Sequence, residues 1–274
     1  MEIPDIEKAK EVLLDVGYYR LGFYWFPFEK SCHSNQRRTH EFWKGSNFDD
    51  AVKLYYFDYA LRNILQKYIT RIEVNFRTYL VYAISNKYST LPTWFVSSHV
   101  VERDYISSFD KEVYTDKFKR NKFIAAHHRN HINDRYALAW KTLEFMTLGS
   151  NIALYKSLLD LDDKKAIAKH YGLRDSNISE NYLDVVRCVR NTCAHGGLLY
   201  DIALYPLIRR GPANVTGDAR KQLYGALKVV GYLLKQVSVN RAADYEREIE
   251  DLINKYATTS ALKSIFHHNS GFPR

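Results

Sequence analysis

The sequence predicts an all-α protein. Apolar side chains recur every three or four residues over most of the chain, as at Leu54, Phe57 and Leu61, and this spacing places them on one face of a helix. Proline and glycine, which weaken helix interiors, number only 6 and 12 among 274 residues. No segment shows the sustained alternation of apolar and polar residues that is typical of strands.

The N-terminal 47 residues are expected to form an appendage to the helical domain. Residues Ile6–Val16 predict a short helix that Gly17 closes. Residues 18–28 are nearly all aromatic, which favours a buried connector. The alternative is a base-stacking surface with Arg20 on a phosphate. The polar and basic residues 29–47 indicate an exposed loop.

Residues 49–88 form the longest periodic segment and predict one long helix with a broad apolar face. Within it, Glu73 and Arg77 are four residues apart, so they can pair across one turn. A carboxylate of this helix could also orient an arginine or histidine of a helix later in the chain. A break at Leu91-Pro92 follows, and residues 109–131 then predict a basic helical stretch. That stretch is either an ordinary solvated face or an RNA-binding surface.

The second half of the chain predicts a series of shorter helices joined by short connections. They are expected at residues 136–148 (stopped by Gly149), 152–161, 163–171, 181–195, from 216 onward with a stripe through Val237, and 245–266. Residues 201–212 predict an irregular return. We therefore expect one all-α domain, composed of the appendage (residues 1–47), a helical core (48–266) and a flexible tail (267–274).

The charge balance favours an acidic partner, and nucleic acid is the main candidate. The formal net charge is +9, the isoelectric point is about 9.2, and the 22 tyrosines could stack on unpaired bases. We expect RNA to be bound by exposed basic and aromatic side chains. The candidates are Tyr19, Arg20, Lys119, Arg120, Lys122, His128, Arg129, Arg209 and Arg210.

The three cysteines, Cys32, Cys188 and Cys193, form no disulfide framework, so we expect reduced thiols in a cytoplasmic protein. No Cys-x2-Cys pair supports a zinc site. His127 and His131 have metal-compatible spacing but lack further ligands. We therefore expect no metal and no cofactor. The charged N-terminus predicts no signal peptide, and no apolar stretch is long enough to span a membrane.

The strongest candidate for chemistry is the trio Arg190, Asn191 and His195, at the end of the helix predicted for residues 181–195. A histidine can transfer protons near neutral pH, and an arginine can bind a phosphate through a planar fork of donors. Asn191 and His195 share a helix face. Arg190 and His195 diverge by about 140° on a straight helix, so they converge only through the long arginine side chain, a bent helix end or a second subunit.

Several segments, in order along the chain, resemble the Abi family of phage abortive-infection proteins (the AbiD/AbiF-like group). The resemblance covers most of the chain between Tyr18 and His195. Its elements are Tyr18-Tyr19-Arg20-Leu21, then Leu54 to Arg62 with Asp58, Ile72-Glu73 with Arg77, Trp140 with Glu144 and Leu148-Gly149, and Arg190-Asn191 with Ala194-His195.

The resemblance implies a HEPN-like helical bundle and metal-independent RNA cleavage, often at a composite site in a homodimer. It implies that Arg190, Asn191 and His195 form the catalytic site and that Glu73 and Arg77 support it. It also implies a toxin-like role in phage defence and association with a small regulatory RNA. Family members often carry an arginine and a tryptophan after the motif histidine, whereas this chain has Gly196-Gly197-Leu198-Leu199-Tyr200-Asp201.

Three functions therefore remain open from the sequence. The first is a metal-independent endoribonuclease. The second is an RNA-binding component of a ribonucleoprotein with little or no catalysis, which the missing arginine favours. The third is a protein-interaction scaffold, which the positive charge disfavours.

Overall fold

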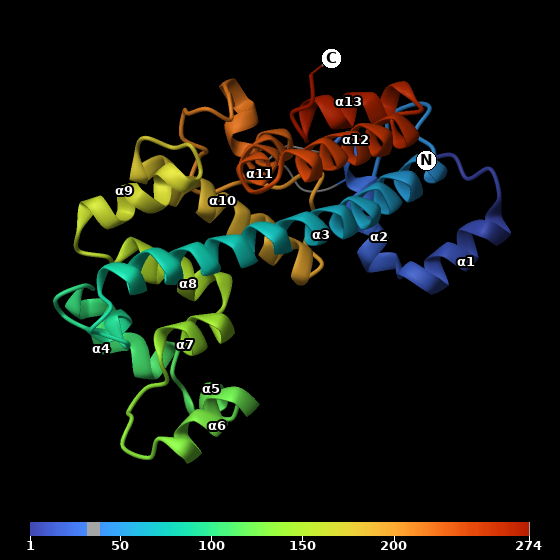
Figure 1. Ribbon diagram of the computed structural model, residues 1–274. Helices are drawn as coiled ribbons and strands as arrows, with labels where there is room; N and C mark the ends of the chain where they lie inside the picture. The colour runs from blue at the N-terminus through green and yellow to red at the C-terminus, as the bar shows by residue number, and fades with distance from the viewer. Residues whose placement is uncertain (32–38, 274) are drawn as a thin grey trace.

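The computed structural model describes residues 1–31 and 39–273, and within them it contains thirteen α-helices, three short 3₁₀ helices and no strand (Figure 1). The predicted all-α class is confirmed. The isolated backbone bridges do not extend into ladders.

The organising element is α3 (Phe48–Lys87), a helix of 40 residues that spans about 60 Å at 1.5 Å per residue. Asn47 caps it by accepting a hydrogen bond from the Asp49 N–H at 2.8 Å. Its apolar stripe is buried at nearly every predicted position, including Leu54, Phe57 and Leu61. Figure 1 shows α3 running through the molecule with helices packed along its length. They are α7 (Ala139–Phe145), α8 (Leu148–Lys156), α9 (Leu161–His170), α10 (Ser176–Ala194), α11 (Leu223–Val237) and α12 (Val239–Tyr256).

The N-terminal segment forms α1 (Ile6–Val16) and α2 (Tyr18–Trp25), and α2 packs on α3. Gly17 ends α1 with a φ of +88°, as its predicted stop requires. The aromatic run divides between two faces of α2 and the following turn. Leu21, Tyr24, Trp25 and Phe28 are buried, whereas Tyr18, Tyr19 and Phe23 are exposed. The buried-connector interpretation therefore describes one face, and the other face presents aromatic rings to solvent.

The segment 29–47 is not simply an exposed loop. Residues 32–38, which include Cys32, lie outside the described residues. At the ends of the segment, Glu29, Ser31 and Ser46 are buried. The Lys30 N–H donates to the Glu41 carbonyl at 2.7 Å, so the two ends are tied together.

The basic helical stretch predicted for residues 109–131 is helical but not continuous. The structure has three helices there, α4 (Arg103–Glu112), α5 (Asp116–Lys119) and α6 (Lys122–Asn130). The break follows from tertiary contacts. Tyr114 is buried, and its hydroxyl accepts a hydrogen bond from the Ala137 N–H at 2.7 Å. Thr115 and Asn121 then cap the two short helices.

Other boundaries differ because capping residues start new helices. Gly149 does not stop a helix but lies in the first turn of α8, where Thr147 is the cap. The helix predicted for residues 245–266 is interrupted, and Thr259 caps α13 (Ser260–His268). A 3₁₀ helix over Gly217–Lys221 precedes α11.

The described part of the tail, up to Pro273, folds back onto the domain rather than fraying. The Ser270 hydroxyl donates to the Tyr200 carbonyl at 2.6 Å, and Asn269 donates to Asp201 at 3.1 Å. Phe272 is buried. These contacts tie the end of the described chain to the segment that follows His195.

Candidate active site

The candidate catalytic helix is α10, which the structure extends five residues beyond its predicted start. Asp175 caps it, and its predicted stripe, including Tyr182, Val186 and Val189, is buried. The helix ends at His195, whose N–H still bonds the Asn191 carbonyl at 3.0 Å. Gly196 follows with a φ of +67°, a conformation that glycine adopts without strain.

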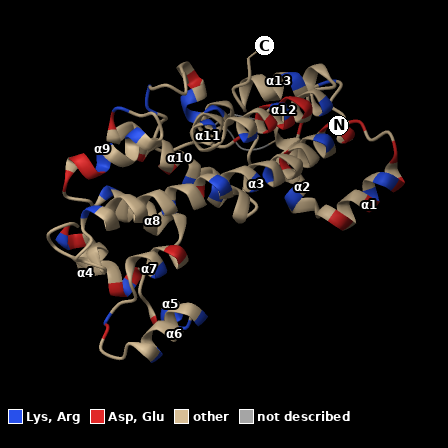
Figure 2. Ribbon diagram, in the orientation of Figure 1, with Lys and Arg blue, Asp and Glu red and all other residues tan. Residues whose placement is uncertain are grey.

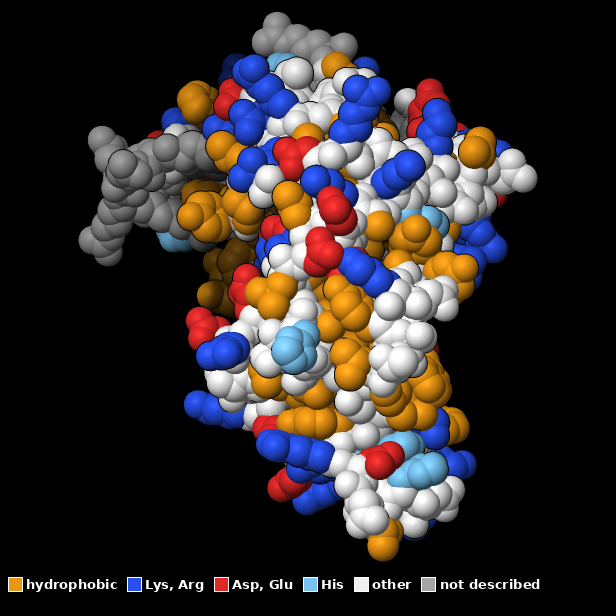
Figure 3. All heavy atoms as spheres, turned by 60° about the vertical axis from the view of Figure 1, so that its left-hand side comes forward, with side chains coloured by type: hydrophobic (Ala, Val, Ile, Leu, Met, Phe, Trp, Pro, Cys, Tyr) orange, Lys and Arg blue, Asp and Glu red, His pale blue; other side chains and the backbone are white. Residues whose placement is uncertain are grey.

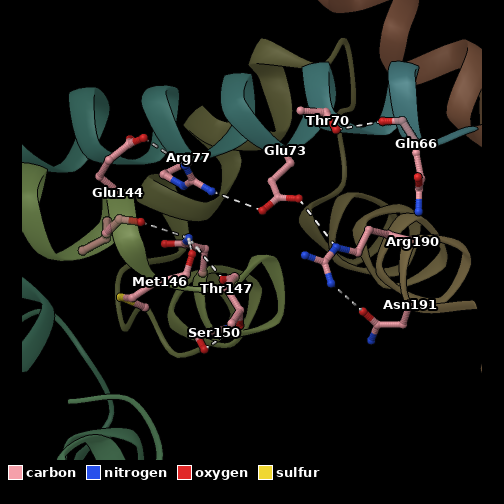
Figure 4. A network of polar contacts seen from close by, with 12 residues as sticks. Gln66, Thr70, Glu73, Arg77, Glu144, Met146, Thr147, Ser150, Arg190 and Asn191 are labelled. Carbon is pink, nitrogen blue, oxygen red and sulfur yellow. Dashed lines mark hydrogen bonds and ion pairs between the residues drawn. The ribbon is translucent and has the colours of Figure 1, made fainter. Parts of the chain in front are cut away.

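Arg190 lies between Glu73 of α3 and its neighbour Asn191 on α10 (Figure 4). Arg190 Nη1 donates to Asn191 Oδ1 at 3.4 Å, and its Nε lies 3.9 Å from Glu73 Oε2. The second distance exceeds hydrogen-bonding range, so this ion pair is loose. The Arg190 side chain is 40% exposed, which leaves its guanidinium accessible to an anionic ligand.

Arg77 extends this cluster to a third helix. Its Nη2 donates to Glu73 Oε1 and its Nη1 to Glu144 Oε1 of α7, both at 3.2 Å. The Arg77 side chain is only 12% exposed, and its Nε is buried without a hydrogen-bond partner. A nearly buried cation requires nearby carboxylates, so Arg77 holds Glu73 and Glu144 in place. The Arg190–Glu73–Arg77–Glu144 ion-pair chain therefore links α10, α3 and α7.

His195 differs from the other members of the trio, because its side chain is exposed and no hydrogen bond or ion pair of the described residues involves its ring. The structure thus brings Arg190, Asn191, Glu73 and Arg77 together. It does not place the His195 ring in contact with them.

The backbone after His195 is held by two side chains of α3, which we call the Asp58–Arg62 clasp. Arg62 Nη2 donates to the Gly197 carbonyl at 2.8 Å. The two Asp58 carboxylate oxygens accept from the N–H groups of Leu199 and Tyr200, each also at 2.8 Å. The segment that carries His195 is therefore fixed by the helix end before it and by the clasp after it.

Asp58 is fully buried, and this burial raises the pKa of its carboxyl from 3.8 to about 6. The N–H groups of Leu199 and Tyr200 and the Arg62 guanidinium favour the charged form and limit the rise. The Tyr24 hydroxyl donates to Asp58 at 3.2 Å and accepts from Arg20 at 3.3 Å. The clasp is thus connected to α2.

The sequence-based candidate site does not include Asp58, Arg62, Tyr24 or Glu144. The sequence did contain an indication of their importance, because Asp58, Arg62 and Glu144 lie in the segments that resemble family motifs. What the sequence lacks is the partner of each side chain. The Asp58 carboxylate, for instance, meets backbone groups 141 and 142 residues away.

The predicted RNA-binding residues fall in three separate places. Tyr19 is exposed on α2, and Arg20 beside it bonds Tyr24. On α5, α6 and the turn between them, Lys119, Arg120, Lys122 and Arg129 are exposed, and His128 bonds the Tyr114 hydroxyl at 2.9 Å. Arg209 and Arg210 are exposed on the return that follows α10. Figure 2 shows lysine and arginine spread over the surface rather than along one stripe.

Neither described cysteine is suited to nucleophilic chemistry. Cys188 and Cys193 are free thiols, and burial raises the pKa of Cys193 to about 12. Within residues 1–31 and 39–273, no cluster of three or more His, Cys, Asp or Glu side chains has a metal-binding arrangement. Across the same residues, none of the helices combines the length and apolar character needed to cross a membrane.

Comparison with known proteins places these features in one family. Residues 11–201 match the family model described as Abi-like protein. The matched region contains α2, α3, the ion-pair chain and the whole trio, and extends through Tyr200. No curated protein and no solved structure gives a significant match. Because the matched region covers well over half of the sequence, the chain belongs to the Abi-like protein family.

Proposed function

We propose that this Abi-like protein is a metal-independent endoribonuclease of the HEPN type, in the AbiD/AbiF-like group, and that it acts in abortive infection against phage. The proposal rests on how His195 is held. Its ring is exposed and without a partner among the described residues, yet its backbone is fixed on both sides. A rigid backbone with a free titratable ring suits proton transfer to a bound substrate.

In the proposed reaction, the ribose 2′-oxygen attacks the adjacent phosphorus and the bond from phosphorus to the 5′-oxygen breaks. His195 accepts the 2′-OH proton, and the leaving 5′-oxygen takes up a proton. Arg190 stabilises the negative charge that builds on the phosphoryl oxygens. Asn191 orients the Arg190 guanidinium, as its 3.4 Å contact indicates. The products are a 2′,3′-cyclic phosphate and a 5′-hydroxyl, and DNA is spared because it lacks the 2′-OH.

A homodimer would supply the second proton-transfer group. One protomer offers one trio, and the His195 ring does not contact Arg190 within it. A twofold axis next to the end of α10 would bring two copies of Arg190 and His195 together, so that one histidine acts as base and the other as acid.

The test compares wild type, His195→Ala and His99→Ala on single-stranded RNA and on DNA of the same sequence, with and without EDTA. His99 is another exposed histidine, away from the trio. We expect wild type and His99→Ala to cleave RNA alone, in EDTA, and to leave cyclic phosphate ends. His195→Ala should lose roughly 10²- to 10⁴-fold in rate while still binding RNA. Cleavage that EDTA abolishes, or equal cleavage of DNA, would contradict the proposal.

The alternative function is an RNA-binding protein that holds a small regulatory RNA without cutting it. The chain offers no arginine directly after His195, and the corresponding backbone is instead engaged by the Asp58–Arg62 clasp. This alternative predicts that RNA remains intact on wild type and on His195→Ala alike.

A further inference from the structure

A hollow of about 330 Å³ opens between α6 and α7, next to the ion-pair chain. On one side the rings of Phe123 and Phe145 stack nearly parallel, with centroids 5.4 Å apart and planes 8° apart. Trp140 also lines the hollow. Phe123 is 60% exposed and Trp140 is 51% exposed, so two large aromatic side chains remain open to solvent. The volume is at the lower end of the roughly 300–1,000 Å³ typical of ligand sites.

The hollow also contains a positioned cation. Lys141 Nζ lies 3.4 Å from His127 Nδ1, while His127 Nε2 lies 3.1 Å from Asp134 Oδ2. The His127 side chain is fully buried, and burial together with Lys141 lowers its pKa. A neutral ring donates from Nε2 to Asp134 and accepts from Lys141 at Nδ1. His127 therefore fixes the Lys141 ammonium beside the aromatic rings.

Glu144 links the hollow to the candidate active site. This residue lines the hollow and also accepts a hydrogen bond from Arg77. Arg77 pairs with Glu73, and Glu73 in turn pairs with Arg190 (Figure 4). A nucleic-acid strand that is bound at Arg190 and follows this chain of ion pairs would therefore lead to the hollow.

Basic side chains border the hollow on α6. Lys122 and Arg129 are exposed on α6, and that helix carries no acidic residue. Figure 3 shows hydrophobic side chains gathered over the lower part of this face, where α4 to α7 lie, with lysines and arginines at its margins. Open aromatic rings beside basic side chains are the combination that single-stranded nucleic acids recognise, because bases stack and phosphates pair with the cations.

We propose that the hollow between α6 and α7 binds one unpaired nucleobase of the single-stranded RNA whose cleaved phosphate is held at Arg190. The base stacks on Trp140 or on the Phe123–Phe145 pair, and Lys141 contacts a base carbonyl or the adjacent phosphate. This base site rests on the proposed function, since it requires that RNA occupy the α10 surface. It selects RNA whose target segment is unpaired, because a base within a duplex cannot enter the hollow.

The test measures binding of a labelled single-stranded RNA of roughly 12 nucleotides by fluorescence anisotropy. All proteins carry His195→Ala so that the RNA stays intact. Trp140→Ala is compared with Trp43→Ala, because Trp43 is also half-exposed (59%) but lies before α3. We expect Trp140→Ala to weaken binding roughly 5- to 150-fold, Trp140→Phe to restore most of it, and Trp43→Ala to change it less than about twofold.

A set of RNAs with one abasic nucleotide at successive positions locates the base. Omission of the bound base should weaken binding to the parent protein and have little further effect on Trp140→Ala. Circular dichroism verifies the fold, and Phe123→Ala provides an independent variant of the same site.

The outcomes separate the two proposals. If RNA binds and Trp140→Ala behaves like Trp43→Ala, the base site is overturned and the proposed function stands. If binding depends on Trp140 but wild-type protein, with His195 present, cleaves nothing, the nuclease is overturned and the base site stands. Failure of the parent protein to bind RNA at low salt overturns both.

Discussion

His195 and His127 are held in opposite ways. At the end of α10, the backbone around His195 is fixed and its ring is free. In α6, the His127 ring is buried and both of its nitrogens have partners. A ring whose hydrogen-bonding groups are already satisfied contributes to structure, whereas a free ring on a rigid support is available to a substrate. We therefore expect His127 to contribute to stability and His195 to activity. Variants of the two histidines and of the clasp test this difference.

The largest expected effect comes from removing the support of His195. Asp58→Ala leaves the Leu199 and Tyr200 N–H groups and the Tyr24 hydroxyl without their acceptor. At roughly 1–3 kcal/mol for each unsatisfied buried group, we expect a loss of at least about 3 kcal/mol in the free energy of unfolding. Urea denaturation measures it, and RNA cleavage should be lost as well.

Asp163→Ala is the matched control for this variant. Asp163 is also buried, but it bonds Lys87 and Tyr88 at the far end of α3. It should lower stability and leave cleavage intact. If both variants lose cleavage equally at a temperature where both are folded, the clasp has no specific role in positioning His195.

The clasp also predicts a pH dependence. Burial raises the pKa of Asp58 from 3.8 to about 6, so the folded state favours the protonated carboxyl. Its contribution to stability is complete below the unfolded pKa and is lost as pH rises through about 6. Relative to Asp58→Asn, the stability of wild type should therefore fall by about 2 kcal/mol between about pH 4 and pH 7. Urea denaturation across this range measures the difference, and a flat difference would show that Asp58 titrates as an ordinary carboxyl.

Removal of the His127 ring and of the His195 ring should change stability by very different amounts. His127→Ala creates a cavity and deprives Lys141 and Asp134 of their shared partner, so we expect a loss of about 2–3 kcal/mol in stability. His195→Ala removes an exposed ring and should change stability by less than about 0.5 kcal/mol. Both values come from urea denaturation at one pH. A large loss for His195→Ala would mean that its ring has a structural role.

A smaller effect on cleavage than that of His195→Ala is expected from the alignment of Arg190. Glu73→Gln removes the charge that aligns the guanidinium, so cleavage should fall about 10- to 100-fold while RNA affinity changes little. Glu248→Gln is the control, because Glu248 pairs with Lys67 on another face of α3. Equal rates for the two variants would show that Arg190 is aligned without Glu73.

The sequence predicts the elements whose boundaries are set locally. The Gly17 stop gives the end of α1, and a long apolar stripe gives α3 nearly to the residue. It fails where a distant partner decides the boundary. Nothing near Tyr114 in the sequence indicates that the Ala137 N–H will bind its hydroxyl and end α4.

Part of the candidate site could be predicted from the sequence, and part could not. Arg190, Asn191 and Glu73 could be grouped by spacing and by resemblance, and the structure brings them together. The clasp could not be predicted, because the spacing of Asp58 and Arg62 on one helix contains no information about residues 197–200. Long-range packing alone determines which backbone groups they meet.

The segment after His195 has a further consequence for the order of folding. It is held by Asp58 and Arg62, by Ser270 and, through Tyr200, by Phe23, with sequence separations of 70 to 177 residues. Contacts between distant residues form slowly, because loop-closure entropy is lost before they contribute. We therefore expect helices to form first and nuclease activity to return last when the unfolded chain is refolded. Stopped-flow circular dichroism measures the formation of helices, and an RNA-cleavage assay measures the return of activity. We expect an interval in which the protein is helical but does not yet cleave RNA.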